Sequence, residues 1–163
     1  MREPKASRPH LPGYGILDAA SGRGLLRWSW ATKRLEKSHN YFVATTRPDG
    51  RPHLMAVWGV WAGGAFYFST GAKSVKARNL AANPRCVVST ERADEAVIVE
   101  GIVRRVRGFR PRAPYAAAYK KKYRWALDPG LGPIFAVRPR LAFGFIEKAN
   151  LFTATATRWV FED

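Results

Sequence analysis

The spacing of apolar and polar positions predicts a chain built mostly from β-strands. Apolar residues alternate with polar ones or form short runs bounded by Gly, Pro and Asp, which is typical of strands. We expect 95–106 to bend at Gly101 and 134–146 to be interrupted at Arg138 and Pro139. The predicted strands are 41–46, 51–61, 66–70, 85–90, 95–106, 134–137 with 141–146, and 156–161.

Turn and helix signals connect these strands. Pro48-Asp49-Gly50 and the Gly-Gly turn at 62–65 each predict a tight connection between neighbouring strands. Apolar residues at spacings of three and four predict an amphipathic helix over 24–38. A short helix is expected to end at Asn83-Pro84, and another helix is expected over 115–125. Six or seven strands with two or three helices indicate a mostly β fold, a small closed or half-closed antiparallel barrel.

Length and local composition predict one domain with an N-terminal extension. A chain of 163 residues is long enough for a single core. Residues 1–23 are rich in Pro, Gly and charge, so we interpret them as an arm, either flexible or strapped over a neighbouring surface. Residues 24–163 are expected to form the barrel domain.

The charge of the chain favours an anionic partner. Lys and Arg total 28 against 12 Asp and Glu, a net charge of +16. Such a field attracts nucleic acid, phosphorylated cofactors or acidic membranes alike. A nucleic-acid-binding barrel of the oligonucleotide-binding type is one alternative, but it predicts aromatics alternating with cations. Here the aromatics stand inside apolar runs such as 66–68, so nucleic acid is the less favoured partner.

The scarcity of cysteine and histidine and the absence of long apolar runs disfavour several classes of protein. Cys86 is the single cysteine, and no secretory segment is evident, which favours a reducing cytoplasm. No apolar run approaches the ~20 residues that cross a bilayer. The three histidines are scattered, so no metal site is expected, and no Ser-His-Asp pattern is present.

The segment 67–84 has the composition of a phosphate-binding loop. A strand ends near Gly71, and a helix start follows, where backbone N–H groups are free to bind an anion. Hydroxyls and cations stand close together at Thr70, Lys73, Ser74, Lys76 and Arg78. The alternative is an ordinary solvated loop. The phosphate interpretation implies a phosphorylated cofactor held by a small β protein.

Trp58 and Trp61 cannot both enter the barrel core. Three residues apart on one strand, they face opposite ways. The exposed one needs another cover: a cofactor ring, a partner subunit or the N-terminal arm. The nearby His53 is a lone histidine among strand residues. Such a histidine is more often structural than catalytic, so we assign no catalytic residue.

The sequence resembles the pyridoxamine 5′-phosphate oxidase-like split-barrel flavoproteins. The resemblance rests on the hairpin YFVATTRPDGRPHLMAVWGVW, the stretch FYFSTGAKSVKARNLAANP with its T-x-x-x-S-x-K pattern, and the strands VVST and VIVEGIVRRV. It covers about Leu25 to Phe161 and is strongest for a branch that uses the deazaflavin coenzyme F-420. Residues that bind substrate phosphate near the C-terminus of true pyridoxamine phosphate oxidases have no match here, which argues against that substrate.

The resemblance implies a homodimer with a flavin-type cofactor, FMN or coenzyme F-420, at each of two interface sites. By position, Ser74 and Lys76 match the phosphate-binding residues. The other residues that the resemblance and the loop assign to the cofactor are Arg51, His53, Val57, Trp58, Thr70, Lys73, Arg78 and Asn79. The basic run 120–122 and the high net charge favour coenzyme F-420, whose tail is polyglutamate. Substrate walls are expected from 10–23 and 125–135 or from the partner.

These features predict an oxidoreductase whose cofactor transfers hydride to a small conjugated substrate. Such an enzyme needs no acid–base pair from the protein, because the cofactor carries the reaction. The main alternative is a binding module that holds FMN or a deazaflavin without turnover.

Overall fold

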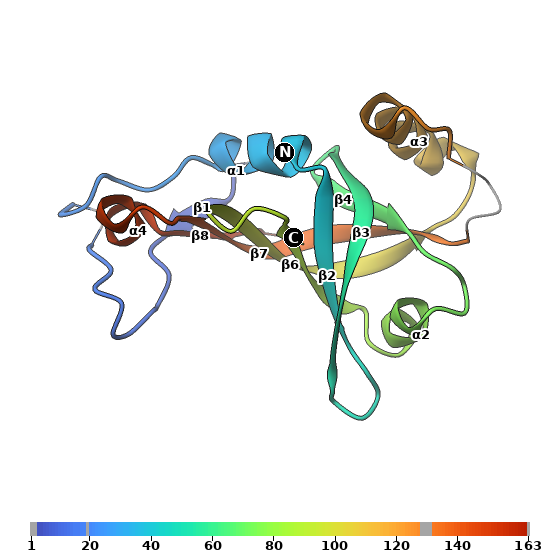
Figure 1. Cartoon of the computed structure of the whole chain (residues 1–163), viewed down its shortest axis with the longest axis horizontal. Helices are drawn as coiled ribbons and strands as arrows, with labels where there is room; N and C mark the ends of the chain where they lie inside the picture. The colour runs from blue at the N-terminus through green and yellow to red at the C-terminus, as the bar shows by residue number, and fades with distance from the viewer. Residues whose placement is uncertain (1–2, 19, 128–131, 163) are drawn as a thin grey trace.

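Six strands close into an antiparallel barrel in the computed structural model, which describes residues 3–18, 20–127 and 132–162 (Figure 1). Around the barrel the strands follow the order β7-β4-β3-β2-β5-β6, and β6 pairs with β7 to close it. The barrel strands are β2 (Asn40–Thr46), β3 (Pro52–Ala62), β4 (Ala65–Ser69), β5 (Arg85–Thr90), β6 (Glu95–Val106) and β7 (Ile134–Ile146). The predicted mostly β split barrel is therefore confirmed.

Two further strands extend the sheet beyond the barrel. β8 (Thr157–Val160) pairs with the second half of β7, and β1 (Lys5–Ser7) pairs with β8. The Arg8 guanidinium then donates to the carbonyls of Ala154 and Ala156, at 2.8 Å each. The Leu17 N–H donates to the Thr153 carbonyl at 3.1 Å. The N-terminal arm thus lies along the end of the sheet, although composition gave no sign of a strand in it.

β7 is continuous through Arg138 and Pro139, so the predicted interruption there was wrong. Pro139 stands opposite Gly101, whereas Leu141 stands opposite Glu100, which leaves Arg140 as an extra residue on β7. This β-bulge accommodates the proline, which has no N–H to give to the ladder. A Cβ on Gly101 would lie 2.5 Å from the Arg138 carbonyl oxygen, so glycine allows the two strands to approach.

The described residues form four helices. α1 (Trp28–Lys37), α2 (Val75–Ala82) and α3 (Phe109–Tyr123) lie beside the barrel, and α4 (Ala149–Thr155) lies beside the extension of the sheet (Figure 1). α1 begins four residues later than predicted. α3 begins six residues before the predicted start at 115 and therefore includes Pro114, which the prediction left outside the helix. α4 was not predicted, because its seven residues have neither a side-chain N-cap nor an acidic first turn. No helix among the described residues has the length and apolarity to cross a bilayer.

Tryptophans occupy much of the barrel core. The ring of Trp28, from α1, lies 5.9 Å from that of Trp61 and 5.2 Å from that of Trp159, measured between centroids. Trp61 is buried, and Trp58 is 48% exposed on the opposite face of β3, as the spacing of three predicted. A second apolar cluster joins α3 to the outer wall of the barrel. It comprises Val60, Val106, Tyr115, Tyr119 and Ile134.

Candidate cofactor site

Ser74 caps the N-terminus of α2 and has one proton to spare. Its Oγ accepts hydrogen bonds from the Ala77 N–H at 3.2 Å and from the Thr70 hydroxyl at 3.1 Å. A hydroxyl has two acceptor lone pairs and one donor proton. Because both lone pairs already accept hydrogen bonds, the Ser74 hydroxyl can bind a ligand only by donating its proton. This suits an anionic ligand.

Lys76 has a buried stem and an unpaired ammonium. The residue is 9% exposed, and burial lowers its pKa below the ordinary lysine value. Within the part of the chain that the structure describes, its Nζ forms no hydrogen bond or ion pair, yet it is not fully enclosed. Placing a cation in such a position is costly unless an anion joins it.

The start of α2 adds backbone donors to these side chains. The N–H groups of Val75 and Lys76 belong to the first turn of the helix, where no intrahelical carbonyl is available. The first turn contains no acidic residue that would compete for them. The helix dipole also favours negative charge at this end. Ser74, Lys76 and the first turn together form a cradle for a phosphate.

Asn79 fixes this cradle to the barrel instead of facing a ligand. It is 2% exposed, and its Nδ2 donates to the Thr45 hydroxyl, which is itself buried, at 2.9 Å. Thr45 stands opposite His53 in the pairing of β2 with β3. The Asn79–Thr45 bond therefore holds α2 beside the first residues of β3.

His53 lies within the electrostatic reach of Lys76. Its pKa is lowered, first by partial burial and then by the positive charges of Arg47 and Lys76. The imidazole is therefore neutral at pH 7, with one nitrogen able to donate and the other able to accept. The structure thus places His53 within electrostatic reach of Lys76, which follows Ser74 and its partner Thr70 at the start of α2.

The first half of β3 presents a free edge next to α2. β4 pairs only with Gly59–Ala62 of β3, so residues 52–58 have β2 on one side and, among the described residues, no strand on the other (Figure 1). Backbone N–H and C=O groups on that edge are available to a ligand. His53, Met55 and Val57 share one face of this stretch. Met55 is 46% exposed and was missed in the sequence, although its alternation with His53 and Val57 is visible there.

Val57 and Trp58 point to opposite faces of β3, so they cannot line the same face of one planar ring. Val57 packs against the barrel core. The Trp58 ring stacks on Tyr123 of α3, with centroids 4.7 Å apart and planes within 8°. α3 thus supplies part of the cover that the exposed tryptophan was predicted to need.

The remaining predicted residues lie around this centre. Arg51 is exposed at the tip of the β2–β3 hairpin, where its guanidinium forms an ion pair with Asp49 at 2.8 Å. Lys73 is exposed in the loop before α2, and Arg78 is exposed on the helix.

The structure groups no three potential metal ligands among the described residues. Burial raises the pKa of Cys86 to about 12, which keeps that thiol unreactive.

Comparison with solved structures shows the same fold in proteins of several activities. An F420 reductase is 28% identical, with a TM-score of 0.56 over 68% of this chain and 93% of its own. The conserved hypothetical protein Rv2991 from Mycobacterium tuberculosis is 22% identical, with a TM-score of 0.66 over 76% and 87%. A heme-binding protein from Mycobacterium smegmatis is 18% identical, with a TM-score of 0.59 over 78% and 60%.

A search of curated proteins found no match. The family model described as pyridoxamine 5′-phosphate oxidase matches residues 31–150, which include the hairpin of β2 and β3, the cradle at α2 and the whole of β6 and β7. That match covers most of the chain and every element of the barrel. The chain therefore belongs to the pyridoxamine 5′-phosphate oxidase family.

Proposed function

We propose that this protein is an oxidoreductase that holds the phosphate of a flavin-type cofactor, FMN or coenzyme F-420, in the cradle at the start of α2. The observation that carries the proposal is Lys76, a nearly buried lysine whose ammonium has no partner among the described residues. The spare proton of Ser74 and the first-turn N–H groups point the same way. The similarity to an F420 reductase supports a cofactor of this class.

The free edge of β3 is the proposed seat of the cofactor ring. Its backbone N–H groups can donate to ring oxygens and nitrogens, and the side chains of Met55 and Val57 supply an apolar surface. Neutral His53 belongs to this edge and is within electrostatic reach of Lys76, so it can exchange one hydrogen bond with the ligand. When bound, the cofactor supplies hydride transfer. The protein positions it, excludes water and stabilises negative charge on the reduced ring.

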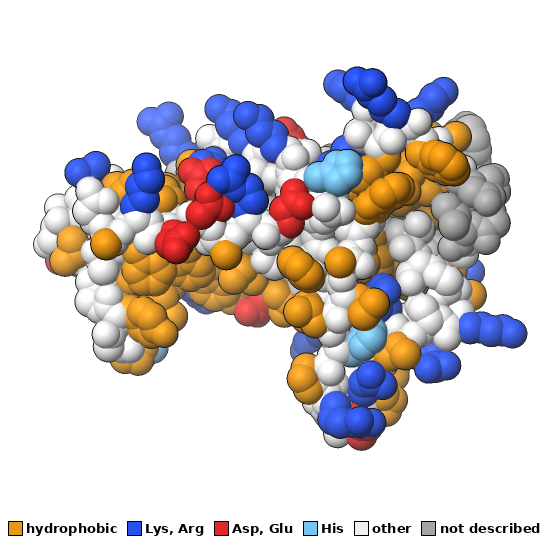
Figure 2. All heavy atoms as spheres, in the orientation of Figure 1, with side chains coloured by type: hydrophobic (Ala, Val, Ile, Leu, Met, Phe, Trp, Pro, Cys, Tyr) orange, Lys and Arg blue, Asp and Glu red, His pale blue; other side chains and the backbone are white. Residues whose placement is uncertain are grey.

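A second copy of the chain is the proposed cover for the apolar side of the β2–β3 hairpin. Phe42, Leu54 and Ala56 share one face of these paired strands, and Phe42 and Leu54 are 39% and 58% exposed. Figure 2 shows hydrophobic side chains gathered along this hairpin. A dimer formed here would place one site near each hairpin and enclose a small conjugated substrate between subunits.

The Lys76→Ala substitution tests the phosphate site directly. Each charge-assisted hydrogen bond contributes about 1.5–3 kcal/mol, so losing the ammonium should weaken binding of FMN or coenzyme F-420 by about 10- to 100-fold. Titration of the purified protein with each cofactor, followed by absorbance and fluorescence, measures this. Lys33→Ala removes an exposed lysine on α1, away from every residue assigned to the cofactor, and is the matched control. Equal affinity in the wild type and the Lys76→Ala variant would refute the phosphate assignment.

Turnover separates the enzyme from a binding module. The reduced cofactor, bound to the wild-type protein, should be reoxidised faster by conjugated acceptors such as quinones than the same cofactor free in solution. A bound cofactor whose oxidation rate is unchanged across a panel of such acceptors would favour storage or transport of the cofactor. Absence of binding to either cofactor would refute the proposed function altogether.

A further inference from the structure

The C-terminal ends of α1 and α3 form one exposed, positively charged edge of the molecule. The two ends adjoin, because the Tyr123 hydroxyl of α3 lies 2.7 Å from the carbonyl oxygen of His39, just beyond α1. Figure 2 shows Lys and Arg side chains projecting above both helices. The exposed cations here, which we call the basic edge, are Lys33, Lys37, Lys120, Lys121 and Arg124.

α3 has one face on the barrel and one face toward solvent. Tyr115 and Tyr119, four residues apart, are buried in the second apolar cluster. Lys122 is also turned inward, with its Nζ 2.6 Å from the Tyr41 hydroxyl and 3.1 Å from the Gly59 carbonyl oxygen. The exposed positions on the opposite side of the helix are Ala113, Ala117, Lys120, Lys121 and Arg124. The outward face of α3 is therefore available to a partner without disturbing its packing.

The cations of the basic edge have no counter-charges of their own. Among the residues that the structure describes, none of the five forms an ion pair. The sequence contains no Asp or Glu from 101 to 127, and the single acidic residue of α1 is Glu36. The field above the two helices is therefore positive and attracts an anionic partner. Its spread over both helices fits an extended surface better than one small anion.

Trp125 distinguishes between the anionic partners. Tyr123 before it and Leu127 after it both pack against the second apolar cluster, and Arg124 between them turns the chain with a φ of 54°. Trp125 is held between these anchored residues, yet it is 63% exposed and forms no ring contact within the described part of the chain. An indole that projects beside lysines is typical of side chains that lie at the boundary between lipid headgroups and acyl chains.

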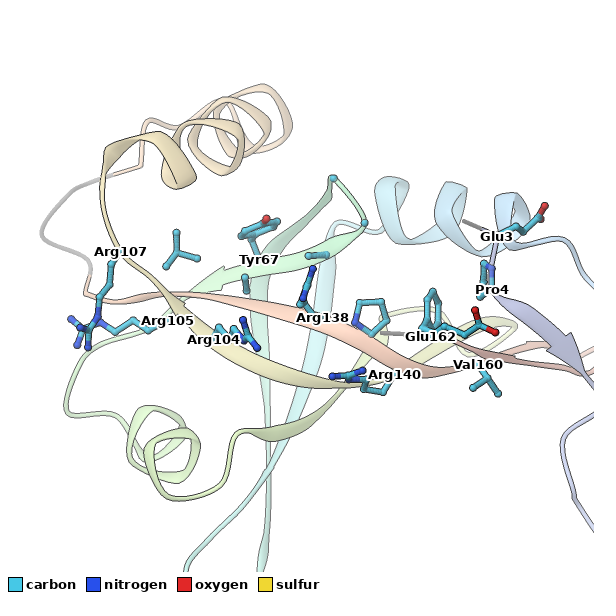
Figure 3. Close-up of a pocket in the computed structure, with 17 residues that line it drawn as sticks. Glu3, Pro4, Tyr67, Arg104, Arg105, Arg107, Arg138, Arg140, Val160 and Glu162 are labelled. Atoms are coloured by element: carbon cyan, nitrogen blue, oxygen red, sulfur yellow. The ribbon is translucent and has the colours of Figure 1, made fainter. Parts of the chain in front are cut away.

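The basic edge is separate from the cavity on the outer wall of the barrel. That cavity has a volume of about 1080 Å³ and is lined by β6, β7, the β3–β4 turn and both ends of the chain (Figure 3). Its cations are arginines, and neither Trp125 nor any cation of the basic edge lines it. The basic edge is an outward surface on two helices, so its partner does not need to enter a cavity.

We propose that the basic edge binds the surface of an anionic phospholipid membrane, with its cations among the headgroups and the Trp125 ring below them. All but one of these cations are lysines, whose compact, strongly hydrated charges suit diffuse attraction to a charged surface. Recognition of nucleic acid relies more on the planar arginine fork. The inference does not rest on the proposed function, because the basic edge contains no residue of the cradle at α2 or of the free edge of β3.

Flotation of the full-length protein with lipid vesicles tests the charge of the surface. At about 0.15 M salt, phosphatidylcholine vesicles with about one third phosphatidylserine should bind at least about 100-fold more tightly than pure phosphatidylcholine. Lys120→Gln/Lys121→Gln should weaken binding to the anionic vesicles about 10- to 30-fold. Lys5→Gln/Lys148→Gln is the matched control. It removes the same charge from exposed lysines at β1 and next to α4, far from α3 (Figure 1), and should bind as the wild type does.

Trp125→Ala tests the feature that separates a membrane from other polyanions. The substitution should weaken binding to the anionic vesicles about 5- to 10-fold, because the ring no longer leaves water. Tyr14→Ala removes a ring that is also 63% exposed, from the N-terminal arm, and should leave binding unchanged. Lipids brominated on their acyl chains should quench the tryptophan fluorescence of the wild type more strongly than that of Trp125→Ala.

Several outcomes would overturn the proposal. They are equal binding to neutral and anionic vesicles, no binding to either, and equal weakening by the two lysine double variants. Duplex DNA that binds more tightly than the vesicles, with Trp125→Ala changing neither affinity, would assign the basic edge to nucleic acid instead. Thermal melting checks that the variants are folded, and quenching of the wild type by brominated lipids needs no variant. A wild type that binds the vesicles but neither FMN nor coenzyme F-420 would refute only the proposed function.

Discussion

Lys122 and Tyr41 join α3 to the barrel through a single hydroxyl. Lys122 Nζ lies 2.6 Å from the Tyr41 hydroxyl oxygen and 3.1 Å from the Gly59 carbonyl oxygen, and 4.5 Å from the centroid of the Tyr41 ring. The same hydroxyl donates to the Leu35 carbonyl of α1. Because its proton is used there, its oxygen accepts from Lys122. One buried tyrosine thus connects two helices.

This arrangement predicts that stability rises with pH in mildly alkaline solution. Burial lowers the pKa of Lys122 from 10.5 to about 8 in the folded protein. Between about pH 8 and 10 the unfolded chain therefore holds more protons than the folded chain, so the free energy of unfolding increases with pH. Above about pH 10 tyrosine ionisation in the unfolded chain reverses the trend, because burial raises the pKa of Tyr41.

Urea denaturation at pH 7.5 and pH 9.5 measures the effect. The increase in the free energy of unfolding should be larger for the wild type than for Lys122→Met, which has no titrating amine. Lys76 also has a lowered pKa but is present in both proteins, so the difference between them reports on Lys122. An identical pH dependence in the two proteins would contradict the expectation.

Asn79→Ala should reduce stability more than it reduces intrinsic affinity for the cofactor. The substitution removes the N–H group from which the buried Thr45 Oγ1 accepts and leaves only the long contact of that hydroxyl with the His53 carbonyl, at 3.5 Å, which costs about 1–3 kcal/mol. Chemical denaturation checks the loss, and cofactor titration of the folded fraction checks the affinity. Arg78→Ala, on the neighbouring exposed position, is the control and should leave stability nearly unchanged.

Gly59→Ala should destabilise the barrel by about 1–3 kcal/mol through overpacking. A Cβ at Gly59 would lie 2.2 Å from the edge of the buried Phe66 ring and 2.8 Å from the Tyr67 carbonyl oxygen. Thermal melting provides the measurement. Gly71→Ala is the comparison, since no atom lies within 4 Å of the corresponding position there. Similar melting temperatures for the two variants would show that the Phe66 ring can move aside.

Leu54→Asp should convert the proposed dimer into a monomer. Leu54 is 58% exposed on the apolar face of the hairpin, so the charge is solvated in the single chain but would be buried between two chains. Light scattering during gel filtration gives the mass of each species. Leu17→Asp, at another exposed leucine on the N-terminal arm, should leave the mass as in the wild type. A wild type that elutes as a monomer would refute the dimer.

The sequence predicted the barrel because its strands are long and their alternation is regular. It predicted Ser74, Lys76 and their helix because the signal is local: a hydroxyl, a lysine and a helix start within a few residues. It assigned Asn79 to the ligand on position alone. The hydrogen bond of Asn79 with Thr45 could not be predicted, because it joins residues 34 apart in the chain. The β-bulge at Arg140 depends on the register between β6 and β7. No short stretch of sequence determines that register, so the bulge could not be predicted.

The substrate walls predicted at 10–23 and 125–135 are still a prediction. Residues 19 and 128–131, which belong to these two stretches, lie outside the described residues. Residues 5–17 run along α4 and β8, held by contacts such as Arg8 with Ala154, which composition alone does not reveal. Contacts between distant segments therefore account for what sequence reasoning missed.

The position of β1 has a consequence for how the protein behaves at high concentration. β8 would otherwise be the last strand of the sheet, with its outer backbone groups open to another chain. The three residues Lys5–Ser7 pair with Arg158–Val160 and cover that edge. Truncation before Arg8 should therefore favour edge-to-edge association and aggregation, so expression variants of this protein are best extended, and not shortened, at the N-terminus.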